Sequence, residues 1–427
     1  MIILPRTYAT VPGFVNFSTE EQGKLRQVIQ SIQEHQAIDE LGLGRIRDAF
    51  SNKMFPGMST LHNRAKYYAV LPSLFLEAER ASYKNVSEVR AKILDLEIKL
   101  TRQLLLGSSS ELANGITGST VIDKAERDND KYVKYDPTYI YYGALTTYGM
   151  IRSDVNIYSL IMERSKIKNA QPPKYLTKEE DEEMGDANQL SGNFQLFDAG
   201  GLSYSFDGVT PISIDLTRDE ANFIKSKILS SPKSKNSFLA SILRDGYPLG
   251  ENNEFFSLGD LWRDRMSDEH YAVYALSVRF SKFQYLLRLI YNYIFYSQTA
   301  FIQGRKDEAD KVLRKYEELK ELWKHEISNE RISEILLYVG GLITDRNSLS
   351  FCETACLLIN NGDSESLKEL QRLIISREKQ TNGSTRSKLA NPLKYKDIEH
   401  VSAYFFDYRW KLVCSVINEI NKGLANG

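Results

Sequence analysis

Hydrophobic side chains recur at helical spacing along most of the chain. Within 87–106, four of them fall on one face of a helix with 3.6 residues per turn: Ile93, Leu96, Leu100 and Leu104. The pattern predicts further helices over 19–37, 45–54, 60–81, 138–150, 217–229, 236–245, 269–303, 305–327, 329–343, 347–361, 363–380 and 398–424. The expected fold class is therefore mostly α.

Turn and capping residues separate these segments. Pro56 and Gly57 predict a tight turn, and Ser59 is placed to cap the helix expected over 60–81. Two helices joined by such a turn have the outline of a helix-turn-helix. We expect an N-terminal helix-turn-helix or winged-helix-like region, followed by a C-terminal helical bundle.

The middle of the chain carries the only β signals. Residues 211–216 alternate hydrophobic and other side chains, which predicts a short strand, so the fold should hold one or two short β elements. Thr217 and Glu220 then form the ends of a capping box that begins the next helix.

An irregular stretch divides the chain. Residues 169–208 hold a Pro-Pro pair, an acidic run and scattered glycines, which is typical of a linker or insertion. The predicted domains are an N-terminal helical domain over 1–168, an acidic linker over 169–210 and a C-terminal helical domain over 211–427.

Composition narrows the class of protein. The 427 residues are 42% hydrophobic, which excludes wholesale disorder, and 55 Lys and Arg against 56 Asp and Glu exclude a globally basic polyanion binder. Three cysteines favour a reducing compartment. We find no signal-like N-terminus and no uninterrupted apolar span, so we expect a cytoplasmic protein without a membrane partner.

A local basic patch stands out against this balance. Over 41–76 there are five basic residues, Arg45, Arg47, Lys53, Arg64 and Lys66, and a single acidic one, Asp48. In a helix-turn-helix, Asn63 and Arg64 would read base edges, while phosphate would be bound by Ser59, Thr60, Arg64 and Lys66. The alternative is a purely structural helix pair, in which Arg64 and Lys66 form ion pairs with nearby acids.

A second stretch is rich in tyrosine. Residues 135–151 predict a helix that begins at a proline, as in a winged-helix element, and Tyr139, Tyr142 and Tyr148 could stack on bases. The alternative is that these rings pack one helix face and keep their hydroxyls in water.

The sequence offers little for catalysis. Cys352 and Cys356 share a predicted helix face but have no further ligands at zinc spacing, and Glu97 with Lys99 forms a nuclease-like pair in a helix rather than a strand. No phosphate loop, dinucleotide fingerprint or nucleophile elbow is present. We therefore assign no catalytic residue, metal site or cofactor.

The segment near the C-terminus joins charge to large rings. Asp407, Arg409 and Trp410 also allow the last helix to begin later, over Lys411–Leu424, and they are expected to orient it as it closes the bundle or contacts a partner. Alternatively, the Arg409 guanidinium stacks on a ring or binds phosphate.

These stretches resemble a prokaryotic family known only as a domain of unknown function. The resemblance rests on three stretches: DELGLGRIRDAFSNKMFPGMSTLHNRAKYY (39–68), PTYIYYGALTTYGMI (137–151) and FDYRW (406–410). The chain departs from the pattern at Asn63 and Lys66, where Thr and Arg are expected. The resemblance implies an accessory protein of bacterial defence loci, found beside helicases or phospholipase-like nucleases.

Three hypotheses follow. The first is an accessory component of an antiviral defence system that binds DNA through the basic N-terminal region and docks a helicase or nuclease of the same locus. The second is a protein scaffold without nucleic-acid contact. The third is a metal-dependent nuclease whose site is dispersed along the chain.

Overall fold

The computed structural model describes residues 39–109, 114–122, 132–152, 156–169, 196–250, 254–398 and 403–426. It confirms a mostly helical protein. The helices are α2 (Gly44–Met54), α3 (Lys66–Ala78), α4 (Val86–Leu106), α5 (Ser119–Ile122), α6 (Pro137–Thr147), α7 (Ile157–Asn169), α8 (Arg218–Ser230), α9 (Phe238–Asp245), α10 (Leu258–Trp262), α11 (Asp268–Gln298), α12 (Arg305–Trp323), α13 (Asn329–Gly340), α14 (Arg346–Asn361), α15 (Ser364–Asn382) and α16 (Trp410–Ala425), with the 3₁₀ turns η1 (Phe255–Ser257) and η2 (Pro392–Tyr395).

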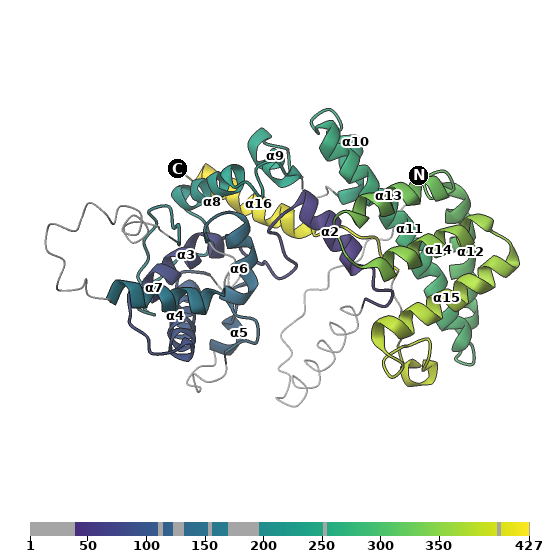
Figure 1. Ribbon diagram of the computed structural model, residues 1–427, viewed down its shortest axis with the longest axis horizontal. Helices are drawn as coiled ribbons and strands as arrows, with labels where there is room; N and C mark the ends of the chain where they lie inside the picture. Colours follow the sequence, from purple (N-terminus) through teal and green to yellow (C-terminus); the bar gives the residue numbers. More distant parts are fainter. Residues whose placement is uncertain are drawn as a thin grey trace, which may run out of the picture.

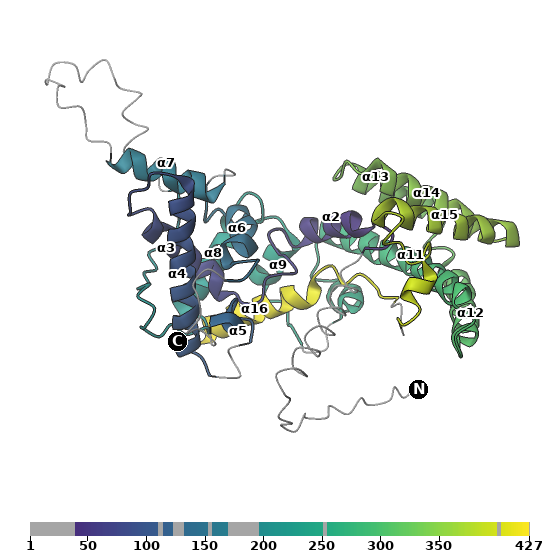
Figure 2. The same ribbon diagram turned by 90° about the horizontal axis from the view of Figure 1, so that it is seen from below.

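The helices form two lobes, with α2 and α16 running between them (Figures 1 and 2). The amino lobe contains the described residues of 56–250 and 403–426, so that α16 packs on α8. The carboxy lobe contains those of 39–55 and 254–398, and here α2 packs on α11 and α13. The chain therefore crosses from one lobe to the other three times. The predicted limits at 168 and 210 stay a prediction, but α8, α9 and α16 join the helices that precede the linker.

A fully buried helix forms the centre of the amino lobe. Every residue of α3 from Lys66 to Phe75 is buried, because α4, α6 and α8 all pack on it. One face of α16 completes this core with Val413, Ile417 and Ile420. Since the unfolded chain would expose these side chains, their burial drives the lobe to fold.

The carboxy lobe is built around α11. This helix is 31 residues long and buried on most of its circumference, and α12 packs beside it after a turn. Helices α13, α14 and α15 stack in chain order, and α15 returns to contact α11. No helix in the described part of the chain is long and apolar enough to cross a membrane.

Several local predictions are confirmed. Thr217 and Glu220 form the capping box, with both reciprocal hydrogen bonds present at the start of α8. The turn at Pro56-Gly57 is also present, and Gly57 has a φ of +81°. An added Cβ there would lie 2.8 Å from the Tyr148 ring, so both conformation and space require glycine.

The expected short strand is wrong. Among the described residues the only β pairing is an isolated antiparallel bridge between Ile151 and Phe197. The segment 211–216 instead lies along α4, where the Ile212 amide donates to the Gln103 carbonyl. Its alternation arises because Ile214 and Leu216 face the core, without any partner strand.

Two predicted helix starts are also wrong, and a third lies outside the described residues. The helix expected over 60–81 begins only at Lys66, because Ser59 to Ala65 form turns. For the last helix the expected start at 398 is wrong, whereas the expected start at Lys411 is confirmed to within one residue: α16 begins at Trp410, because Tyr408 and Arg409 have φ values of 51° and 67°. The expected helix over 19–37 falls in the part not described.

Candidate functional site

The proposed recognition helix is enclosed by protein. Residues 55–65 separate α2 from α3, and α3 presents no free face that could enter a DNA groove. Lys66 Nζ lies 2.5 Å from Glu220 Oε1, and the two side chains are only 3% and 4% exposed. Arg64 Nε lies 2.7 Å from Glu419 on α16. A helix-turn-helix is therefore not what this segment shows, and the ion-pair interpretation describes these two residues.

The other residues predicted to contact nucleic acid divide into three groups. Arg47 donates to Asp48 and lies over the Phe406 ring, while Tyr142 is half-buried and Tyr148 is a core residue. Asn63 is exposed on the loop before α3. The remaining four, Arg45, Lys53, Ser59 and Tyr139, line hollows on the surface beside α2.

These hollows follow one another along α2. The first has a volume of about 740 Å³, the second about 560 Å³ and the third about 630 Å³. Arg45 and Asp345 line both the first and the second, and Asn52 lines both the second and the third. We call this row of hollows the α2 furrow. It runs from the carboxy lobe to the amino lobe.

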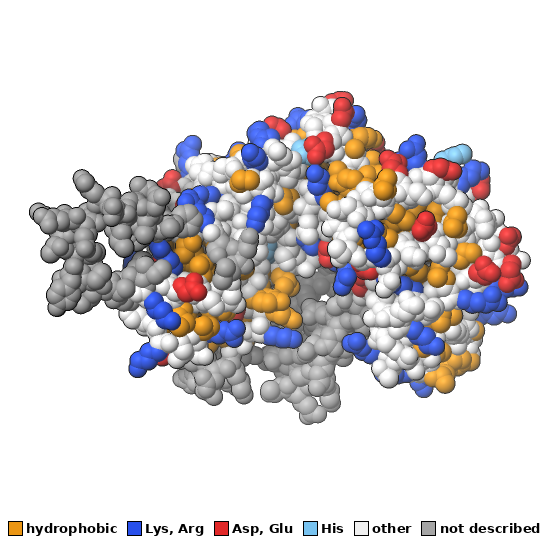
Figure 3. Space-filling view, viewed as in Figure 1, with side chains coloured by type: hydrophobic (Ala, Val, Ile, Leu, Met, Phe, Trp, Pro, Cys, Tyr) orange, Lys and Arg blue, Asp and Glu red, His pale blue; other side chains and the backbone are white. Residues whose placement is uncertain are grey.

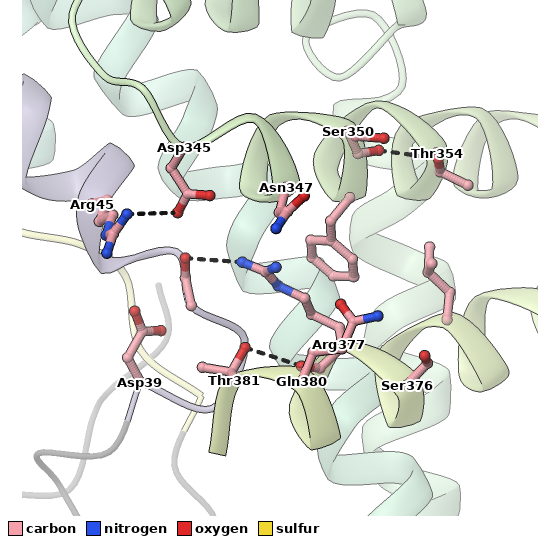
Figure 4. Close-up of a pocket in the computed structure, with 13 residues that line it drawn as sticks. Asp39, Arg45, Asp345, Asn347, Ser350, Thr354, Ser376, Arg377, Gln380 and Thr381 are labelled. Atoms are coloured by element: carbon pink, nitrogen blue, oxygen red, sulfur yellow. Dashed lines mark hydrogen bonds and ion pairs between the residues drawn. The ribbon is translucent and has the colours of Figure 1, made fainter. Parts of the chain in front are cut away.

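The first hollow is polar and lies between α14 and α15 (Figure 4). Asn347 from α14 and Gln380 from α15 face the space between the helices. Arg377 is buried and donates to the carbonyls of Leu41 and Gly42, which fixes the turn that leads into α2. Arg45 Nη1 lies 3.6 Å from Asp345, and the Arg45 side chain is 72% exposed. Hydroxyl and amide groups therefore line this end of the furrow, together with the carboxylates of Asp39 and Asp345 and the accessible guanidinium of Arg45.

The third hollow is built around a buried histidine. His62 Nδ1 accepts from the Ser59 amide and lies 2.8 Å from the Tyr68 hydroxyl, while Nε2 lies 3.1 Å from the Ile140 carbonyl. Burial lowers the pKa of His62 to about 4, so the ring is neutral at pH 7. The hydrogen bonds are those of a neutral ring, with a proton on Nε2. This histidine fixes the loop rather than acting as a base.

Arg409 connects the two lobes in the floor of the same hollow. It extends from the start of α16 and donates to Asn52 Oδ1 at 2.9 Å, to the Met58 carbonyl at 2.5 Å and to Asp48 Oδ1 at 2.9 Å. Its neighbour Trp410 packs on Phe55 and Trp262. Asp407 accepts from the Arg409 amide. These contacts orient α16 against α2.

An exposed ring pair flanks the third hollow. Tyr139 is 62% exposed and Tyr135 is 43% exposed, and their ring centroids are 5.1 Å apart with an interplanar angle of 29°. Lys134 Nζ lies 5.2 Å from the centroid of the Tyr135 ring. Asp136 caps α6 between the two rings by accepting from the Tyr139 amide. The pair therefore presents two aromatic faces beside the furrow.

Charge is distributed unevenly along the furrow. Asp39 and Asp345 line the first hollow beside Arg45, whereas Lys233 and Arg409 line the third, whose described lining includes no acidic side chain. Figure 3 shows basic side chains spread over the amino lobe with few acidic ones between them. Burial, assisted by the charge of Asp136, raises the pKa of Glu97 to about 8, so this buried acid of the amino lobe is mostly protonated at pH 7. The amino-lobe end of the furrow is thus the more positive end.

The sequence pattern did not single out three residues at or beside the furrow: Tyr135, Asn52 and Lys233. Tyr135 stands in the tyrosine-rich stretch, and its spacing of four from Tyr139 could have suggested a pair on one side of α6. Asn52 and Lys233 carry no such signal, because each gains its place only when distant segments meet at the third hollow.

The acidic and cysteine side chains named in the sequence analysis are used in structural contacts among the described residues. Among the described residues, no three His, Cys, Asp or Glu side chains lie close enough to hold a metal ion. Glu97 is buried in α4 and accepts from the Thr138 amide, and Asp95 pairs with Lys99. Burial raises the pKa of Cys352 and of Cys356, which suits core thiols.

Comparison with known proteins adds one finding. Residues 10–169 match a family of unknown function, DUF6361. The DUF6361 segment includes the two blocks on which the sequence resemblance mainly rests. It carries Arg45, Lys53, Ser59 and Tyr139, whereas Lys233, Arg409 and the α14–α15 wall lie outside it. No curated protein and no solved structure matches the chain.

Proposed function

We propose that this protein binds nucleic acid along the α2 furrow. The observation that carries the proposal is the convergence of four residues nominated from sequence, Arg45, Lys53, Ser59 and Tyr139, on one continuous row of hollows. They would meet the ligand there with cations, a hydroxyl and an aromatic face. The contact surface is thus the furrow rather than α3.

Electrostatics supports the same conclusion. Arg45, Lys53 and Lys233 are exposed cations that line the furrow. Arg45 lies 3.6 Å from Asp345 and Lys53 lies 3.2 Å from Glu269, and a phosphate would compete with these exposed ion pairs, which contribute little in water. Each phosphate that a cation neutralises releases counterions. Three such contacts would make log K fall by about two to three for each unit of log salt.

The test is fluorescence anisotropy with labelled DNA and RNA, each single-stranded and duplex, at two salt concentrations. The double variant Arg45→Glu/Lys53→Glu should weaken binding at least about tenfold and flatten the salt dependence. The matched control is Lys84→Glu/Lys166→Glu, which makes the same charge change on exposed residues outside the furrow. Equal loss in both variants would reduce the effect to net charge, and unchanged binding in the furrow variant would overturn the proposal.

A partner protein forms the second part of the proposal. Leu337 on α13 is 82% exposed, more than any other large hydrophobic side chain in the described residues, so it is the residue chosen to test such a contact. The sequence resemblance suggests a helicase or nuclease of a bacterial antiviral locus as the partner. Co-elution with neighbouring gene products, lost in Leu337→Glu, would support this role. Retained co-elution in that variant would exclude a contact through Leu337.

A further inference from the structure

We infer that the α2 furrow binds unpaired, single-stranded nucleic acid, and that Tyr139 and Tyr135 stack against its bases. This inference rests on the proposed function and adds to it the class of ligand. It concerns the amino-lobe end of the furrow, where the exposed ring pair adjoins the third hollow.

The rings of Tyr135 and Tyr139 lie side by side at the start of α6. Pro137 and the Asp136 cap fix the start of α6, so Tyr135 and Tyr139 keep their ring contact across the cap. The two rings therefore lie next to each other, where one strand can meet both.

Their exposure is not explained by packing. The neighbouring Tyr141 on α6 is buried and contacts His62 and Tyr67, so the lobe uses it as core. Tyr139 lies on the opposite side of the helix, where it lines the furrow with most of its surface in water. A large exposed ring next to cations is the arrangement that binds bases and backbone together.

Ring stacking favours unpaired bases. In a duplex both faces of each internal base are covered by neighbouring bases, so a protein ring gains access only to a base that is free of its stack. Stacking also tolerates any base, because every base has a π face. The ligand class is therefore single-stranded DNA or RNA without strong sequence preference.

The rest of the furrow suits the backbone of such a strand. Helix α2 has 11 residues and is about 16 Å long, and Arg45 and Lys53 stand near its two ends. At the third hollow, Lys233 adds a further cation beside the tyrosines. A strand lying along α2 would thus meet bases at one end and phosphates along its length, over several nucleotides.

The test compares a labelled dT oligonucleotide, an rU oligonucleotide and a duplex of the same length on the full chain. The single strands should bind at least about tenfold more tightly than the duplex, since one stacked base contributes about 1–3 kcal/mol. Tyr139→Leu should lose about fivefold to 100-fold in single-strand affinity, while Tyr139→Phe retains it because the ring remains. The matched control is Phe301→Leu, since Phe301 is 63% exposed on the carboxy lobe.

A direct readout accompanies affinity. A 2-aminopurine base in the strand should lose fluorescence on binding the wild type and Tyr139→Phe, and keep it with Tyr139→Leu. If duplex binds as tightly and Tyr139→Leu has no effect while Arg45→Glu/Lys53→Glu loses binding, the single-strand inference is overturned and the nucleic-acid function stands. If no nucleic acid binds at low salt, both fail.

Discussion

Lys66 provides the sharpest distinction between a structural and a DNA-contacting role for the basic N-terminal patch. The substitution Lys66→Met keeps the length of the side chain and removes its ammonium. In the wild type that ammonium lies 2.5 Å from Glu220, inside the contact between α3 and α8. The variant therefore leaves a carboxylate that is only 4% exposed without its cation.

The expected cost follows from the surroundings of Glu220. Breaking a buried ion pair by removing one partner costs about 3–5 kcal/mol. Two donors remain on this carboxylate, the Tyr204 hydroxyl at 2.6 Å and the Thr217 amide at 2.8 Å. They offset part of the loss, so we expect the lower end, about 3 kcal/mol. That corresponds to a fall in Tm of about 6–12 °C if the amino lobe unfolds as a unit.

Circular dichroism during thermal and urea unfolding measures the effect, and anisotropy on the same sample measures nucleic-acid affinity. The matched control is Lys99→Met, whose partner Asp95 is half-exposed, so the loss should be about 0.5 kcal/mol. A second variant, Lys66→Met/Glu220→Gln, removes the charge from both partners and should recover part of the stability. Unchanged stability with weakened, salt-sensitive binding in Lys66→Met would refute the structural role and restore Lys66 as a phosphate contact.

Three further predictions concern other parts of the amino lobe. Burial raises the pKa of Glu97 to about 8 from 4.5, so the native state keeps a proton that the unfolded chain releases. The stability that protonated Glu97 provides is complete below the unfolded pKa of 4.5 and is lost as the pH rises through about 8, so the Tm should decline over that range. Glu97→Gln should abolish this decline. A variant whose Tm still falls with pH as in the wild type would contradict the prediction. Gly57→Ala should lower the free energy of unfolding by about 2 kcal/mol in urea titrations, because φ is +81° and the added methyl group would meet the Tyr148 ring. An unchanged free energy of unfolding would show that the turn does not require glycine. Arg409→Lys cannot keep all the hydrogen bonds to Asn52, Met58 and Asp48, so hydrogen exchange of the backbone amides should become faster in 55–62 but not in α12. Unchanged exchange rates in both segments would show that Arg409 does not hold the two lobes together.

Local features of the sequence correctly predicted those helices that have a regular hydrophobic spacing or a capping residue at their start. The 3.6-residue period located α4, and the capping box located the start of α8 to within a residue. Such features succeed because they act between residues three or four apart, which any helix brings together.

Long-range contacts decided the places where prediction failed. Helix α3 begins six residues late because His62 holds the preceding turns through the Ser59 amide and the Ile140 carbonyl. The last helix starts at Trp410 because Arg409 takes a left-handed conformation while it reaches α2. The partners of these groups lie up to 361 residues away, so no window of sequence contains them.

The candidate site shows the same division. Arg45, Lys53, Ser59 and Tyr139 share one furrow, and their role in nucleic-acid binding stays a prediction. Arg45 and Lys53 are exposed in their ion pairs with Asp345 and Glu269, whereas Arg64 and Lys66 carry the same charge and are enclosed in theirs. Sequence records that a side chain is basic, and only packing determines whether an acid from a distant helix neutralises it.

The sequence by itself determined the helical class, because periodic hydrophobic positions can be buried only by helices at that spacing. It also determined the local caps and turns. The tertiary structure alone decided the furrow, the pairing of charges and the return of α16 to the amino lobe, because each depends on which distant surfaces exclude water from one another.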